Sequence, residues 1–286
     1  MLKKILLSLS FYSTVLLYAQ NDGAFVIYTA KGKKVSLEKM LNTLSKKDAV
    51  FFGEQHDNPI AHWIELQVLT KMEAEHHSEL VVGFEMYEHD QQALFTQFLN
   101  KQLNEKQFKD TVRQWNNYST DYKPLLLFMR EKQLNGIATN VPRKFANLLF
   151  KKGQKALDTL SVEDKSNMVP LPFSIDSTLT QYAALKEMEQ HMGGKHMLAA
   201  QALKDATMAF FLLESIKKGK KILHFNGAYH TDFNQGIMWY IQQSVPSLAT
   251  ISISTVTQKS IDRLEKEHMN KAPFIICIAD DMTRTY

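Results

Sequence analysis

The sequence predicts an α/β fold: a largely parallel central sheet flanked by helices, with a helical insertion. Short apolar runs alternate with longer stretches of helical pattern, and most of these runs are apolar on both faces, as buried parallel strands are. Polar residues with reactive side chains stand directly after several of the runs. We expect strands at residues 49–52, 80–84, 136–139, 222–225, 249–253 and 274–278.

The first nineteen residues have the layout of a secretory signal peptide. Lys3 and Lys4 precede an apolar run that ends at Ala19, and this run is short and weakly apolar for a membrane-spanning helix. We therefore expect an exported protein, periplasmic or secreted, and the alternative is an uncleaved anchor. The single cysteine, Cys277, lies far from this leader, so we expect no lipid anchor of the bacterial lipoprotein type.

Residues 20–286 are expected to form one domain. Removing nineteen of the 286 residues leaves 267, which is enough for one large core. Leaving Lys3 and Lys4 out of the 34 basic residues leaves 32 against 30 acidic ones. This near balance of charge gives no support to nucleic-acid binding.

Two long helices have recognisable ends in the sequence. Asn58 can cap a helix that begins at Pro59 and runs to about Glu75, since proline fits the first helical turn. A second helix runs from near Lys195 to Gly219. Between them, the helix-rich segment from about residue 144 to residue 194 contains a proline-punctuated stretch, and we interpret it as an insertion that forms a cap or wall over the site.

The candidate functional residues follow the predicted strands. Glu54 and His56 come after the first strand of the βα pattern, Glu85 after the second, and His230 after the fourth. The carboxyl ends of parallel strands meet at one edge of a sheet, where ligands bind, so these side chains are expected to converge. Both histidines close a Gly-x-x-His motif, in which glycine permits close approach of the backbone to a ligand.

Carboxylates and imidazoles can bind a divalent metal ion or hold and deprotonate a water molecule. Glu54, His56, Glu85 and His230 are therefore candidate metal ligands and candidate catalytic residues. The alternative is a buried hydrogen-bonded network that ties the strand ends together without a ligand. Arg143, after the third strand, can anchor a carboxylate or phosphate or pair with Glu54 or Glu85, and we expect the pairing.

Histidines and polar residues on the two long helices leave further alternatives open. Gln201 and Asp205 share one face of the second helix, so they either orient the site histidines or form a solvated stripe. His62, His76 and His77 lie on or beside the first helix and are expected to be surface imidazoles.

A different chemistry is suggested by side chains that can serve as haem axial ligands. The candidates are Tyr87, Tyr182, Tyr229 and His191. Spacing does not select among them, and for each tyrosine the alternative is a half-buried packing residue.

Five segments together resemble the ChaN-like haem-binding uptake family, which belongs with the Tiki proteases and the erythromycin esterases in one superfamily. They are GEQHDNP (53–59), GFEMY (83–87), NVPR (140–143), QALKDATMA (201–209) and GAYH (227–230). The resemblance covers about residues 45 to 255 and implies the α/β fold.

For function, the resemblance has two implications. The ChaN-like branch implies an exported haem-binding protein of iron acquisition, a partner in an outer-membrane haem or iron transport system, and homodimers that enclose stacked haems with tyrosine ligation. The Tiki branch implies metal-dependent hydrolysis by the two Gly-x-x-His motifs, which here end at His56 and His230, with Glu54 and Glu85 beside them. In our own hydrolase hypothesis, Arg143 holds the substrate. We expect haem binding, and the hydrolase is the alternative. The chain departs from lipoprotein members in lacking the lipidated cysteine.

Overall fold

The computed structural model describes residues 23–191 and 195–286, so the predicted signal peptide lies outside the described residues. All six predicted strands are present to within a few residues. They are β3 (Ala49–Glu54), β4 (Leu80–Glu88), β5 (Asn135–Asn140), β6 (Lys221–Gly227), β7 (Thr250–Gln258) and β8 (Phe274–Ala279). These strands pair in parallel in the order β8-β7-β3-β6-β4-β5, which confirms the predicted α/β class.

A short hairpin that the sequence analysis did not predict extends one edge of this sheet. Its strands are β1 (Phe25–Thr29) and β2 (Lys34–Val35), and β1 pairs antiparallel with β8. The hairpin turns at Gly32, which has the positive φ of 77° that glycine tolerates. The central sheet is therefore mixed, with eight strands in the order β2-β1-β8-β7-β3-β6-β4-β5.

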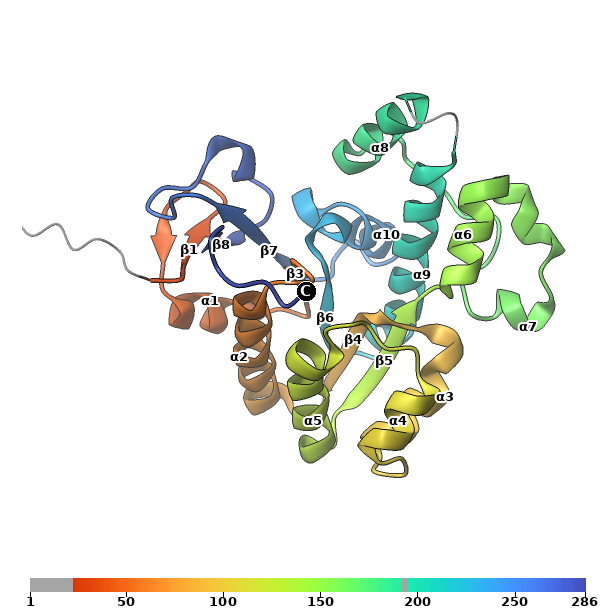
Figure 1. Cartoon of the computed structure of the whole chain (residues 1–286), viewed down its shortest axis with the longest axis horizontal. Coiled ribbons are helices and arrows are strands. Elements are labelled where there is room, and N and C mark those ends of the chain that lie inside the picture. The colour runs from red at the N-terminus through yellow and green to blue at the C-terminus, as the bar shows by residue number, and fades with distance from the viewer. Residues whose placement is uncertain (1–22, 192–194) are drawn as a thin grey trace, which may run out of the picture.

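Helices cover both faces of the sheet (Figure 1). Those in the first half of the chain are α1 (Leu37–Leu44), α2 (Pro59–His76), α3 (Gln92–Leu99), α4 (Glu105–Thr111) and α5 (Lys123–Lys132). Those in the second half are α6 (Arg143–Lys152), α7 (Val162–Lys165), α8 (Thr180–His191), α9 (Met197–Lys217) and α10 (Ile237–Ser244). The start of α2 is as predicted, because the Asn58 side chain accepts the backbone N–H groups of Ile60 and Ala61 and Pro59 opens the helix.

Side chains of β3 alternate between two cores. Val50 and Phe52 pack with apolar residues of α2, α3 and α5, whereas Ala49 and Phe51 pack with α9 and α10 on the other face. Both faces of the sheet are thus buried, which explains why most of its strands are largely apolar on both faces, although β6 and β7 also bury polar residues such as His224 and Ser252.

The predicted insertion contains α6, α7 and α8 and packs beside α9 (Figure 1). Phe145 and Leu149 of α6 form a separate small core with Met168 and with Leu203 of α9. Within the residues that the structure describes, no helix is long and apolar enough to cross a membrane.

Gly53 in β3 is a position where the fold admits no side chain. A Cβ atom there would lie 2.8 Å from the Cα atom of Ala228 and 2.8 Å from the carbonyl oxygen of Ile253. Both contacts are with backbone, which cannot move without disturbing the neighbouring strands. We expect Gly53→Ala to lower the free energy of unfolding, measured by urea denaturation, by about 3 kcal/mol.

A second variant separates backbone from side-chain crowding at Gly53. Adding Ala228→Gly removes only a Cβ atom 3.3 Å away, so it is expected not to rescue Gly53→Ala. A Gly53→Ala protein within about 0.5 kcal/mol of the wild type would contradict this account.

Candidate functional site

The carboxyl ends of β3, β4 and β6 bring the predicted residues together. Glu54 ends β3, Glu85 lies in β4, and Gly227 ends β6 before a short turn that carries His230. A pocket of about 700 Å³ opens at this edge of the sheet. Its lining includes Glu54, His56, Leu185, Met188, Gln201, Gly227, Ala228, Tyr229, His230 and Val256.

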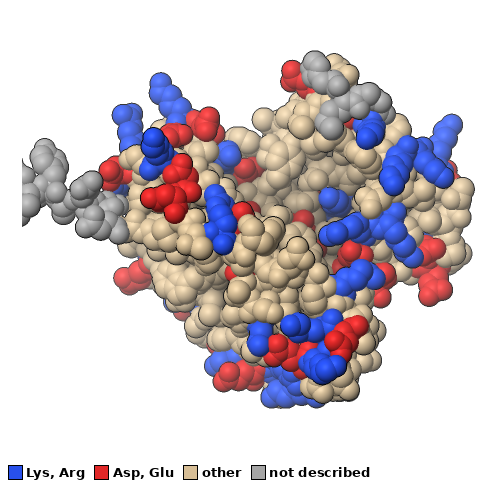
Figure 2. Space-filling view, in the orientation of Figure 1, with Lys and Arg blue, Asp and Glu red and all other residues tan. Residues whose placement is uncertain are grey.

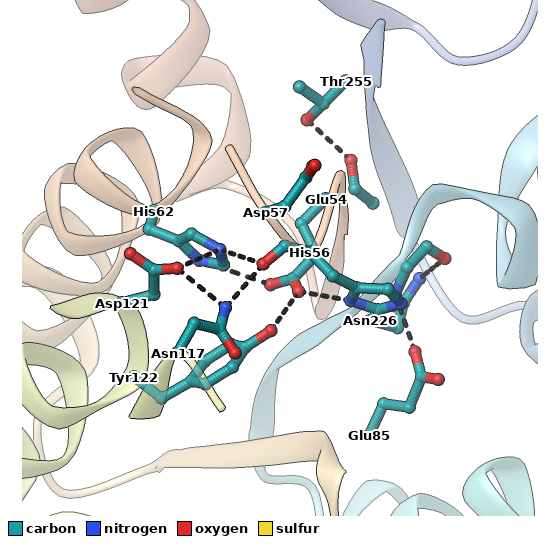
Figure 3. Close-up of polar contacts among 12 residues, drawn as sticks. Glu54, His56, Asp57, His62, Glu85, Asn117, Asp121, Tyr122, Asn226 and Thr255 are labelled. Atoms are coloured by element: carbon teal, nitrogen blue, oxygen red, sulfur yellow. Dashed lines mark hydrogen bonds and ion pairs between the residues drawn. The ribbon is translucent and has the colours of Figure 1, made fainter. Parts of the chain in front are cut away.

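Glu54 and His56 form the first ion pair of the site (Figure 3). His56 Nδ1 donates to Glu54 Oε1 over 2.7 Å, and the hydroxyl of Tyr122 donates to the same oxygen over 2.6 Å. Burial raises the pKa of the Glu54 carboxyl, but the imidazoles of His62 and His56 outweigh it and lower the pKa to about 2. Glu54 is therefore a buried carboxylate at neutral pH.

His230 forms the second ion pair and lies between two buried carboxylates. Its Nε2 atom is 3.0 Å from Glu85 Oε1, and its Nδ1 atom contacts Asp205 Oδ1. Burial lowers the pKa of His230, but Glu85 and Asp205 outweigh it and raise the pKa to about 10. Burial likewise raises the pKa of Glu85, yet the charge of His230 holds it well below its usual range. His230 is therefore an imidazolium that lies between the carboxylates of Glu85 and Asp205.

Gln201 and Asp205 both face the site, and Asp205 orients His230. The Gln201 side-chain nitrogen lies 2.9 Å from His230 Nδ1, and Asp205 is fully buried. The alternative of a solvated stripe is therefore wrong for these two residues. Asp205 also accepts the hydroxyl of Tyr182 over 2.6 Å, so it is held from two sides.

The two ion pairs meet at Gly227. Its backbone N–H donates to Glu85 Oε2 over 2.7 Å, and a Cβ atom there would lie 2.8 Å from His56 Nε2. The glycine of the second Gly-x-x-His motif thus leaves room for the histidine of the first.

The four residues nevertheless form two adjacent pairs and not one metal-ligand cluster. Among the described residues, ligand atoms converge within 4.8 Å in two groups: Glu54, His62 and Glu65, which are buried, and Glu265, Glu267 and His268, of which only the histidine is buried. The set of Glu54, His56, Glu85 and His230 is in neither group.

His62 is buried, so the prediction of a surface imidazole was wrong. Its Nδ1 atom donates to Glu65 Oε2 over 2.8 Å. Its Nε2 atom donates to the backbone oxygen of His56 over 3.1 Å (Figure 3). Burial lowers the pKa of His62, but the carboxylates of Glu54, Glu65 and Asp121 outweigh it and raise the pKa to about 10. His62 and Glu65 lie three residues apart on the buried face of α2, beside Ala61 and Ile64, and this spacing was the only sign of their burial in the sequence.

Two other residues of this network were not singled out from the sequence. Asn117 donates to the backbone oxygen of His56 over 2.5 Å and to Asp121 Oδ2 over 2.7 Å (Figure 3). Both lie before α5 in a segment without a strand or motif, so no sequence pattern pointed to them. Together with His62 they hold the backbone of His56 in place.

Arg143 does not pair with Glu54 or Glu85, so the expected pairing was wrong. Across the described residues it forms no ion pair, and its side chain is exposed. Both carboxylates are already paired with histidines, and Val141 and Pro142 turn the chain so that Arg143 opens α6. Arg143 instead lines a second pocket, of about 650 Å³.

The tyrosines proposed as haem ligands have different surroundings. Tyr87 is buried in an aromatic cluster, and its hydroxyl donates to Gln114 over 3.2 Å. Tyr182 is also buried and donates to Asp205. Tyr229 is 38% exposed, lines the pocket beside His230, and donates to the backbone oxygen of Gln181 over 2.7 Å. The side chain of His191 lies outside the described residues.

Comparison with known proteins identifies the family. The chain is similar over 89% of its length to the ChaN protein of Campylobacter jejuni, whose structure shows cofacial haem binding, at 17% identity, 97% coverage of that chain and a TM-score of 0.67. It is also similar to a mutant of the erythromycin esterase EreC in its open conformation, at 10% identity, 81% and 77% coverage and a TM-score of 0.50. No match was found among curated protein sequences. Because the model of the haem-binding uptake family ChaN, of the Tiki superfamily, matches residues 40–241, the chain belongs to that family.

Proposed function

We propose that this protein binds haem in the 700 Å³ pocket at the carboxyl edge of the sheet, with Tyr229 as the iron ligand. The observation that carries the proposal is the position of Tyr229, whose phenol lines the pocket in a chain of the haem-binding uptake family. Residues 1–19 direct export, and the protein passes its haem to an outer-membrane uptake system. The mass of the mature chain shows whether residues 1–19 have been removed, which tests export. The mass of the haem complex shows whether it is a homodimer.

The lining of the pocket fits a porphyrin. Leu185 and Met188 of α8 face the pocket together with Ala228, Tyr229 and Val256. Met188 and Tyr229 are among the few large apolar side chains exposed on the described surface. Exposed apolar groups around a concave site are typical of ligand pockets, and the volume is in the usual range. The helical insertion thus supplies one wall of the site.

The phenolate oxygen of Tyr229 would be a suitable ligand for a ferric ion, which bound haem would supply as a Lewis acid. Burial, with Asp205 and Asp232 nearby, raises the pKa of Tyr229, so the free phenol is protonated at neutral pH. Ligation through the phenolate therefore releases a proton, and haem binding is expected to tighten as the pH rises.

The test is an absorbance titration of purified protein with haem. We expect a shifted Soret band at one haem per chain, and we expect Tyr229→Phe to change the spectrum and weaken binding by about tenfold or more. Tyr240→Phe is the matched control, because Tyr240 also donates to a backbone carbonyl but does not line this pocket. An unshifted Soret band rejects haem binding, and a Tyr229→Phe spectrum identical to the wild type rejects the ligand.

We do not propose the metal-dependent hydrolase. In that reading Glu54, His56, Glu85 and His230 hold a metal or an attacking water, whereas in the fold these groups neutralise one another in two ion pairs. Their ligand atoms do not converge on a common point within the described part of the chain.

A further inference from the structure

A second pocket adjoins the first along the same edge of the sheet. The first pocket lies over the ends of β3, β6 and β7, and the second, of about 650 Å³, is lined by residues that follow β4 and β5. Because β6 pairs with β4 and β4 pairs with β5, the two pockets are neighbours. Trp115 lines the second pocket, and its ring centroid is 4.6 Å from that of His56 in the first, so these two rings form the shared wall.

The second pocket carries positive charge on the α6 side. Figure 2 shows Lys and Arg side chains gathered on that side of the central hollow. Three cationic residues line the pocket: Arg113, Arg143 and Lys144. The first pocket, in contrast, presents the apolar groups of Leu185 and Met188 beside Tyr229. The first pocket therefore has an apolar wall above its charged floor, and the second holds three cationic side chains beside Glu88 and Asp90.

Only one of these three cations is without an acidic partner among the residues described. Arg113 pairs with Glu88 over 2.8 Å and also contacts Asp90, and Lys144 pairs with Asp164 over 3.1 Å. Arg143 has no such partner in the described segments, so its guanidinium is available to an anionic ligand. The acidic pair around Arg113 repels a carboxylate, which directs an anion toward Arg143.

We propose that the second pocket is the subsite for the carboxylates of the ligand, and that Arg143 binds the propionate groups of a haem whose ring occupies the first pocket. This inference rests on the proposed function. Haem combines a planar apolar ring with two carboxylates on one edge, which matches the apolar wall of the first pocket and the guanidinium of Arg143 in the second. A guanidinium pairs with a carboxylate through two parallel hydrogen bonds, which a lysine cannot reproduce.

The spacing of the sheet supports this arrangement. Tyr229 follows β6 and Arg143 follows β5, two strands away. Two strand spacings amount to about 10 Å, a separation that a porphyrin with its propionate arms spans. Trp115 provides a flat apolar wall between the two parts of the hollow.

The experiment compares haem with haem dimethyl ester, in which both carboxylates are blocked, on the full chain. We expect the wild type to bind haem about tenfold more tightly than the ester, because a charge-assisted hydrogen-bonded pair is lost. Arg143→Gln is expected to weaken haem binding by about tenfold and to leave binding of the ester unchanged. Lys152→Gln, an exposed charge at the other end of α6, is the control and is expected to change neither.

The outcomes distinguish failure of this subsite from failure of the proposed function. If Arg143→Gln binds haem as the wild type does, or weakens haem and ester equally, the subsite is wrong while haem binding stands. If wild-type protein shifts the Soret band of neither compound, both proposals are wrong. Arg143 is exposed, so its substitution is expected to leave the melting temperature unchanged, which a thermal melt verifies.

Discussion

Replacing His230 with alanine is expected to lower the free energy of unfolding by about 3–5 kcal/mol at pH 7. In the wild type, the imidazolium neutralises Glu85 and Asp205, which approach it from opposite sides. Alanine leaves two buried carboxylates without their counter-charge. Removing one partner of a buried ion pair costs more than the pair itself contributes, because the remaining charge stays desolvated.

Urea denaturation at several pH values measures this effect. The penalty of His230→Ala is expected to shrink as the pH falls, since protonation of Glu85 and Asp205 removes their repulsion. His77→Ala is the matched control, because exposed His77 also pairs with a carboxylate, Glu73, over 3.1 Å, and its loss is expected to cost less than about 1 kcal/mol. Equal losses in the two variants would show that the buried clamp contributes no more than a surface pair.

The stability of the wild type is expected to fall by several kcal/mol, on the order of 5, between pH 6.5 and pH 10. His62 and His230 are the cause, because neighbouring carboxylates raise the pKa of each from 6.5 to about 10 in the folded state. A folded pKa above the unfolded one means that the folded state binds the extra proton. This contribution is complete below pH 6.5 and is lost as the pH rises through about 10.

Carboxyl groups with lowered pKa values change the stability in the opposite direction, because their contribution is lost as the pH falls. The pKa of Glu54 is lowered to about 2 and that of Glu85 is lowered well below 4.5, so their stabilisation is present above pH 4.5 and is lost on acidification. The combined contribution of these four groups is therefore expected to be highest between about pH 4.5 and pH 6.5. Urea midpoints from pH 3 to pH 10 measure the curve, and a midpoint that stays constant from pH 6.5 to pH 10 would contradict the assigned imidazolium charges.

The predicted site residues thus interact mainly with one another, in the ion pairs Glu54–His56 and Glu85–His230. Their mutual pairing gives the pocket a rigid, charged floor, and Tyr229 stands at its side. A buried hydrogen-bonded network was the alternative to a metal site, and the observed pairing has that form. Such a floor can orient a ligand without ligating it.

The positions of the six strands and of the motifs at their ends could be predicted from the sequence. Most of these strands are runs that are largely apolar on both faces, and this property is visible along the chain itself. The Gly-x-x-His motifs end at His56 and His230 for an equally local reason: glycine is needed where another group approaches the backbone closely.

The choice of partner for each side chain was decided only by the tertiary structure. Burial of His62 depends on which face of α2 meets the sheet, and the path of Arg143 depends on the turn after β5. Tyr182 and Tyr229 both carry a phenol, yet one is sealed against Asp205 and the other lines the pocket. Sequence determines the local pattern, whereas hydrogen-bond partners and exposure follow from distances across strands and helices that local patterns do not contain.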